Sequence, residues 1–237
     1  KEKKNKKVRD FSGWNVYDAI IVQYENWKQK IVNGGVPSAK ISVLGSARFC
    51  SEWEDIYFNI IPKPSLDFSE ISGKLKLVFM DHSPEFRLDV NATLNTFKRL
   101  SELDFLDIII KPSTGSAKML TSPKLSEFAK IDSENSSISL IQWADVVIGS
   151  ISSIMLDVLI LDKPFIFPKY FIKTEQLWEK KEVCWVVNNS DELEQALQKL
   201  KERPKFKPYS RKKVDEFITE IVYGGKPGRD VLGDYVE

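Results

Sequence analysis

One stretch near the middle of the chain limits the fold more than any other, because it holds two buried strands and the helix that must join them. The run Asp145–Ile148 is short, apolar and β-branched, as in a strand covered on both faces. Gly149 ends this strand, and Pro164 ends the helical segment that follows. Phe165–Phe167 then predicts the next strand. The stretch therefore predicts a βαβ unit with parallel strands.

Serines stand where the helix of this unit should begin. We expect the hydroxyls of Ser150, Ser152 and Ser153 to cap the helix, with backbone N–H groups directed outward at the carboxyl end of the sheet. An anion fits such a position. Asp157 follows Ser153 by about one helical turn, so its carboxylate can reach a ribose hydroxyl beside a bound phosphate. The alternative is an ordinary βαβ unit whose serines only cap the helix.

Strands alternate with helices along the rest of the chain, which predicts an α/β fold: a Rossmann-like, doubly wound, mainly parallel sheet with helices on both faces. Residues 122–136 are polar and variable, and no element is predicted there. Further strands are expected at 18–23, 41–44, 75–80, 107–110 and 183–187, and helices at 24–33, 89–103, 137–143, 174–180, 192–200 and 214–222.

Two more loops follow predicted strands and carry residues suited to phosphate. They supply glycine, hydroxyl and cationic groups at the carboxyl ends of strands, where α/β proteins bind ligands. The order of residues is not that of a P-loop. For the first loop taken alone, a tight turn with a surface arginine is the favoured interpretation. The candidate residues are Gly45, Ser46, Arg48, Lys111, Ser113 and Thr114.

His82 is the only histidine in the chain, and it lies in a polar loop after the predicted strand 75–80. Its ordinary pKa suits proton transfer near neutral pH, which makes it a candidate catalytic residue. The alternative is a histidine that only stabilises the loop.

Composition excludes several classes of protein. The 237 residues carry a net charge of +1, with positive charge concentrated in Lys1–Arg9 and Lys199–Lys213. These runs suit either a solvated surface or peripheral contact with an anionic membrane, and without interleaved aromatics they do not indicate nucleic acid. Two distant cysteines, Cys50 and Cys184, and one histidine make a zinc site very unlikely and indicate reduced thiols. Because no apolar run approaches about twenty residues, we expect a cytoplasmic protein, and a peripheral position at the inner face of the membrane is the open alternative.

The motifs together resemble the C-terminal, donor-binding domain of GT-B type glycosyltransferases, and within these the surface-polysaccharide group that includes the CDP-glycerol glycerophosphotransferases. The residues that match this family are Gly45–Arg48 for its Gly-x-x-Arg motif, Lys111 and Pro112 for the start of its Lys-Pro-His-Pro motif, and Ser152–Asp157 followed by Lys163 and Pro164. The chain departs from the family at Ser113 and Thr114, which replace His-Pro, and at Ile151, which replaces a tyrosine.

The resemblance implies a transferase that uses a CMP-, CDP- or UDP-linked sugar or alditol-phosphate donor to build bacterial surface polysaccharide such as capsule. It implies that the serine pair holds the donor phosphate and that Asp157 lies near the nucleotide. It requires no metal or other cofactor, and the acceptor is a glycan or a lipid-linked glycan. We expect residues 1–17 to be a basic lead and 18–237 the donor domain, one half of a GT-B fold.

Most of an acceptor domain is missing before this part of the chain, so we expect it in another segment or a partner chain. Two other functions remain open. One is a sugar-nucleotide epimerase of the same fold, and the other is a non-catalytic nucleotide-binding or interaction module.

Overall fold

The computed structural model describes residues 9–61, 73–81, 89–113, 122–172 and 174–236. These residues form two compact units, and the boundaries between them fall within helices α2 (Ser51–Ile60) and α9 (Arg211–Val222). The smaller unit combines Lys1–Phe58 with Asp215–Glu237, and the larger unit is Asn59–Val214. Each unit is described by itself.

A six-stranded sheet organises the larger unit, and every neighbouring pair of its strands is parallel. The strand order is β5-β4-β3-β6-β7-β8, so the chain moves outward from β3 in one direction and then returns to extend the sheet in the other. This is the order of a doubly wound Rossmann-like sheet. The strands are β3 (Leu75–Met80), β4 (Leu106–Lys111), β5 (Lys130–Ile131), β6 (Val146–Ile148), β7 (Phe165–Pro168) and β8 (Trp185–Val187).

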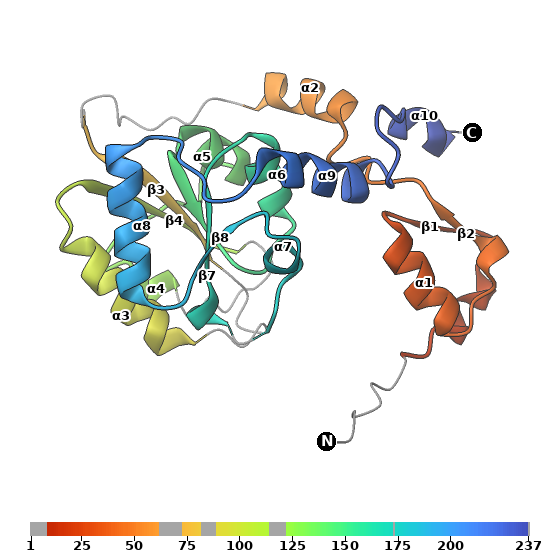
Figure 1. Cartoon of the computed structure of the whole chain (residues 1–237), viewed down its shortest axis with the longest axis horizontal. Helices are drawn as coiled ribbons and strands as arrows, with labels where there is room; N and C mark the ends of the chain where they lie inside the picture. Colours follow the sequence, from red (N-terminus) through yellow and green to blue (C-terminus); the bar gives the residue numbers. More distant parts are fainter. Residues whose placement is uncertain (1–8, 62–72, 82–88, 114–121, 173, 237) are drawn as a thin grey trace. The chain divides into compact units, whose positions relative to one another are not determined.

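Helices cover both faces of this sheet, which is why its central strands are apolar at nearly every position. Helices α3 (Val90–Ser101) and α8 (Ser190–Glu202) pack on one face, and α5 (Ser137–Trp143) and α6 (Ile154–Ile160) lie on the other (Figure 1). Two short helices, α4 (Ser122–Leu125) and α7 (Leu177–Lys180), complete the unit.

Phe79 lies at the centre of the core beneath α3. It is fully buried, and the register places it opposite Ile110 on β4 and Ile148 on β6. Its ring lies 4.8 Å from that of Phe97 on α3 and 6.1 Å from that of Phe171. The alternation along β3 therefore sends Phe79 to one helical layer and its neighbours Val78 and Met80 to the other.

The smaller unit contains its own two-stranded parallel sheet, β1 (Ile20–Val22) and β2 (Ile41–Val43), joined by α1 (Glu25–Asn33). Residues from these elements form a separate apolar cluster. The last helix, α10 (Val231–Val236), belongs to this unit.

Gly45 has φ of +89°, and a Cβ there would lie 2.1 Å from the carbonyl oxygen of Val222, so this turn requires glycine.

The α/β, mainly parallel, doubly wound fold predicted from the sequence is confirmed. The polar stretch 122–136, for which no element was predicted, contains α4 and the edge strand β5. Both are too short to produce a recognisable period in the sequence. The predicted division of the chain at residue 18 stays a prediction.

Replacing Phe79 with alanine should lower the unfolding free energy of the larger unit by about 3 to 5 kcal/mol, since it leaves a cavity beside the rings of Phe97 and Phe171. Urea titration followed by tryptophan fluorescence measures this change. Ile60→Ala is the control, because Ile60 is 72% exposed, and it should change stability by less than about 0.5 kcal/mol. Similar small effects for both variants would show that this ring cluster is not the core.

Candidate functional site

A cavity of about 90 Å³ lies where the strand order of the larger sheet reverses. At such a point the loops after two neighbouring strands diverge, and open α/β sheets bind ligands in the crevice between them. We call it the switch-point cavity. It is lined from the ends of β3 and β4, the start of α5 and the loop before α6, by Met80, Asp81, Lys111, Pro112, Ser113, Ser137, Ser152 and Ile154.

Lys111 brings a buried positive charge to the wall of the cavity. Only 6% of the residue is exposed, and its Nζ donates hydrogen bonds to the carbonyl oxygens of Ser133 at 3.2 Å and Asn135 at 2.6 Å. Burial lowers the pKa of its ammonium group, and the negative charge of Asp132 acts in the opposite direction. The side chain thus ties the end of β4 to the loop before α5.

Asp132 shapes that loop. Its carboxylate accepts hydrogen bonds from the backbone N–H groups of Glu134 at 3.1 Å and Asn135 at 2.9 Å, and from Asn135 Nδ2 at 2.8 Å. Burial opposes ionisation, but these bonds and the charge of Lys111 hold the pKa of Asp132 below its ordinary value. Ser136 then caps α5 by accepting a hydrogen bond from the backbone N–H of Ser139. The turn places Ser137 against the cavity.

Asp81 and Ser137 also line the cavity, although no sequence motif had singled them out. Asp81 is 8% exposed at the end of β3, and Ser137 is the first residue of α5. The sequence carried a signal for Ser137, because an Asp-Ser-Glu-Asn-Ser run is typical of a turn that leads into a capped helix.

The serine loop after β6 differs in detail from its prediction. Ser152 Oγ accepts a hydrogen bond from the backbone N–H of Ile154 at 3.3 Å, whereas Ser153 occupies the N-cap position and makes no capping bond with its side chain. The expected cap by Ser153 is therefore wrong, because its backbone is already helical, with φ of −60° and ψ of −20°. Ser150 and Asp157 are buried and do not line the cavity, so their contact with a donor stays a prediction.

The other predicted site residues fall elsewhere. Gly45, Ser46 and Arg48 belong to the smaller unit. The backbone N–H of Ser46 donates to the carbonyl oxygen of Val222 at 2.8 Å, and Arg48 lies over the Phe49 ring. These contacts are those of a tight turn with a surface arginine, and a phosphate contact here stays a prediction. His82 and Thr114 lie outside the described residues.

Much of the basic run Lys199–Lys213 is held by contacts within the larger unit, to which it belongs. Lys199 and Arg203 lie over the Phe206 ring, Lys201 lies over Phe105, Lys207 and Arg211 pair with Asp162, and Lys213 pairs with Glu182. These contacts give the charges a structural role, and contact with an anionic membrane stays a prediction. Within the described ranges, no helix is long and apolar enough to cross a membrane.

Both cysteines are free and buried, as expected. Burial raises the pKa of the Cys184 thiol to about 12, which keeps it protonated and unreactive. In the part of the chain that the structure describes, no three His, Cys, Asp or Glu residues come together as metal ligands.

The fold and the position of the cavity define a Rossmann-like α/β protein whose sheet has the layout of one half of a GT-B fold. No protein-family model and no curated protein matches the chain. Solved structures match it by fold. One is a UDP-N-acetylglucosamine 2-epimerase from Rickettsia bellii, at a TM-score of 0.61 and 15% identity, with 93% of this chain and 58% of that chain covered.

Two further structures are similar. S. aureus MnaA, in a co-structure with UDP, matches at a TM-score of 0.53 and 14% identity, over 87% of this chain and 60% of that chain. The wall teichoic acid polymerase TagF matches at a TM-score of 0.50 and 16% identity, over 93% of this chain and 57% of that chain. The chain thus spans less than two thirds of the length of these structures, and at such identities the likeness shows the fold alone.

Replacing Lys111 with methionine should destabilise the larger unit by about 1 to 3 kcal/mol, because two carbonyl oxygens lose their donor while the side-chain volume is kept. Urea titration measures the loss. Lys98→Met, at an exposed position on α3, is the matched control and should have little effect. Equal stabilities of the two variants would contradict a structural role for the Lys111 ammonium group.

Asp132 should make stability depend on acid pH. Because its folded-state pKa lies below the ordinary value of 3.8, its contribution is complete above that value and is lost as the pH falls through the folded-state pKa. The difference in unfolding free energy between the natural protein and Asp132→Asn should therefore become smaller as the pH falls from about 5 to about 2, as measured by urea titrations. The exposed Asp104→Asn serves as the control. A gap that stays constant over this range would refute the assignment.

Proposed function

We propose that the chain binds a nucleotide-activated donor at the switch-point cavity and is the donor-binding part of a GT-B type transferase. The donor is a CMP-, CDP- or UDP-linked sugar or alditol phosphate, and the product is a bacterial surface polysaccharide. One observation carries the proposal: hydroxyl groups and a buried lysine from separate loops converge on a cavity at the strand-order reversal of a Rossmann-like sheet.

The size and chemistry of the cavity suit the phosphate part of such a donor. Its volume of about 90 Å³ is well below the range of about 300 to 1,000 Å³ that is usual for small-molecule sites, so it suits the phosphate group of a donor more than the whole donor. The hydroxyls of Ser113, Ser137 and Ser152 can donate hydrogen bonds to phosphate oxygens. Lys111 adds positive potential, although two of the three donors of its ammonium group are occupied by carbonyls.

Asp81 gives the cavity a second kind of contact. A carboxylate repels phosphate but accepts hydrogen bonds from hydroxyls, so Asp81 suits a ribose or sugar hydroxyl beside the phosphate. Donors fixed around the phosphate would also stabilise the negative charge that develops there when the donor bond breaks. Transfer further requires an acceptor, a glycan or a lipid-linked glycan, and the groups that bind it in another segment or partner chain.

A sugar-nucleotide epimerase is the second candidate. The fold likeness to the Rickettsia bellii epimerase favours it, since that TM-score of 0.61 exceeds the 0.50 for TagF. The two functions differ in their products. A transferase moves the sugar or alditol phosphate to an acceptor or slowly to water, whereas an epimerase returns an isomer of the intact nucleotide sugar. Nuclear magnetic resonance of the incubated donor distinguishes them, and an unchanged donor would favour a non-catalytic binding module.

Nucleotide binding tests the proposal directly. Calorimetry with CMP, CDP, UMP, UDP and GDP should show a preference for one base. The double variant Ser113→Ala with Ser152→Ala should weaken that binding about tenfold or more, because it removes two donors to phosphate. Ser101→Ala is the matched control, since its hydroxyl bonds to the carbonyl oxygen of Lys98 at the end of α3.

An unchanged affinity in the double variant, with an intact fold by circular dichroism, would refute the switch-point cavity as the phosphate site. Binding of none of the five nucleotides by the natural chain would contradict the proposal for this chain by itself.

A further inference from the structure

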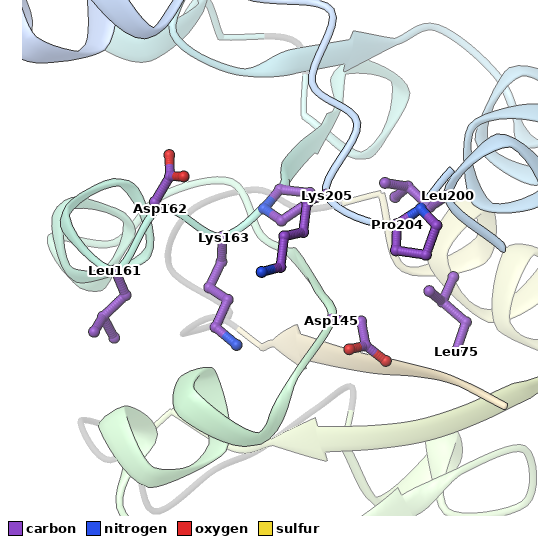
Figure 2. Close-up of a pocket in the computed structure, with 9 residues that line it drawn as sticks. Leu75, Asp145, Leu161, Asp162, Lys163, Leu200, Pro204 and Lys205 are labelled. Carbon is purple, nitrogen blue, oxygen red and sulfur yellow. The ribbon is translucent and has the colours of Figure 1, made fainter. Parts of the chain in front are cut away.

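A second, larger pocket of about 320 Å³ lies at the opposite edge of the same sheet (Figure 2). Its walls include the first residue of β3, Leu75, and residues just before β6 and β7, Asp145 and Lys163, so it opens at the amino ends of the strands. We call it the amino-edge pocket. A volume of this size falls within the range of about 300 to 1,000 Å³ that is usual for small-molecule sites.

Ammonium groups gather on one side of the amino-edge pocket. Lys163 and Lys205 both line it, and in Figure 2 their side chains extend into the same region. Nζ of Lys163 donates to the carbonyl oxygens of Gln142 at 2.9 Å and Ala144 at 2.7 Å, which fixes its position and leaves one of its three donors for a ligand. Burial lowers the pKa of Lys163, the charge of Asp145 raises it, and the charges of Lys205 and Lys76 lower it.

One of the two acids in the lining is already paired with cations that do not line the pocket. Asp162 pairs with Lys207 and Arg211, and in Figure 2 its carboxylate points away from Lys163 and Lys205. Asp145 is the other acid in the lining, and one of its oxygens accepts a hydrogen bond from the backbone N–H of Lys76 at 2.9 Å. A bound anion would relieve the repulsion between the lysines.

Two residues that line this pocket have a left-handed backbone conformation. Asp162 has φ of +54° and Lys205 has φ of +67°, a region that L-residues other than glycine rarely adopt. Both residues line the pocket, and they are two of the three non-glycine residues with positive φ among those described. Asp162 directly follows the C-cap of α6, where the backbone N–H of Lys163 donates to the carbonyl oxygen of Val158, so its positive φ is that of an ordinary helix end.

We propose that the amino-edge pocket binds a small sugar phosphate, at a site separate from the switch-point cavity. Lys163 and Lys205 hold the phosphate as two point charges. Asp145 accepts hydrogen bonds from sugar hydroxyls through its second oxygen. Leu75, Leu200 and Pro204 lie across the pocket from the lysines in Figure 2 and pack against the carbon skeleton. The lysines, the carboxylate and the apolar residues thus match the phosphate, the hydroxyls and the carbon skeleton of a sugar phosphate.

Calorimetry on the full chain tests the site with glucose 6-phosphate, inorganic phosphate and glucose as probes. We expect glucose 6-phosphate to bind more tightly than inorganic phosphate, and glucose not to bind. Amide chemical shifts should change around residues 161–164 and 204–205 and not around 111–113. Equal binding of glucose 6-phosphate and phosphate, or shifts confined to 111–113, would overturn the proposal.

Variants that remove a positive or a negative charge test the site further. Lys205→Gln should weaken glucose 6-phosphate binding about tenfold, because it removes one ionic contact. The exposed Lys98→Gln, which removes the same charge on α3, should change it less than about twofold. Asp145→Asn should strengthen binding of inorganic phosphate. Equal losses for the two lysine variants would show general electrostatic attraction and overturn the site.

A variant of the other cavity separates this inference from the proposed function. The double serine variant of the switch-point cavity should leave glucose 6-phosphate binding unchanged. A matching loss in that variant would assign the probe to the switch-point cavity and overturn the amino-edge site.

Discussion

The pairing of β3 with a parallel neighbour on each side is the constraint on which the larger unit depends. Phe79 and Leu77 meet β4 on one side and β6 on the other, and helices bury both faces. The backbone groups of a central strand are paired with both neighbouring strands, so only the residues at the ends of the strand can contact a ligand. Because all six strands are parallel, the two sites lie at opposite edges of one sheet, at the carboxyl and amino ends of β3.

One buried lysine, Lys111, and one half-buried lysine, Lys163, hold α5 between these sites. Lys111 donates to carbonyls of the loop before α5, and Lys163 donates to the carbonyls of Gln142 and Ala144 at its carboxyl end. The last carbonyls of a helix have no partner within it, and a cation there is also favoured by the helix dipole. Each lysine thus serves the fold with two donors and presents its remaining charge to a pocket.

Much of the fold was predictable because its signals are local. The buried run of β6, the stop at Pro164 and the amphipathic stripe of α3 are properties of neighbouring residues. The site was predictable only in part. Lys111, Ser113 and Ser152 follow strands and line the switch-point cavity, as expected from their position. Lys111 is largely committed to backbone carbonyls, however, and its partners lie some twenty residues further along the chain.

Other features arise from contacts that no local pattern encodes. The amino-edge pocket combines Leu75, Asp145, Lys163 and Lys205, which only the parallel pairing of β3, β6 and β7 brings together. The capping role of Ser152 in place of Ser153 depends on where the helical backbone begins, and a run of several serines does not specify that residue.

The closure of the smaller unit has a consequence for biosynthesis. Gly45 and Ser46 meet Val222, and Val43 accepts a hydrogen bond from Arg229, so this unit joins segments that leave the ribosome far apart in time. The larger unit is continuous in sequence and can fold as soon as it has emerged. The apolar cluster around Ile31 lies within residues 11–43 and can form early, but Ser46 and the carbonyl oxygen of Val43 must wait for the segment that carries Val222 and Arg229. A nascent chain stalled before α9 therefore lacks the backbone contacts that close the smaller unit.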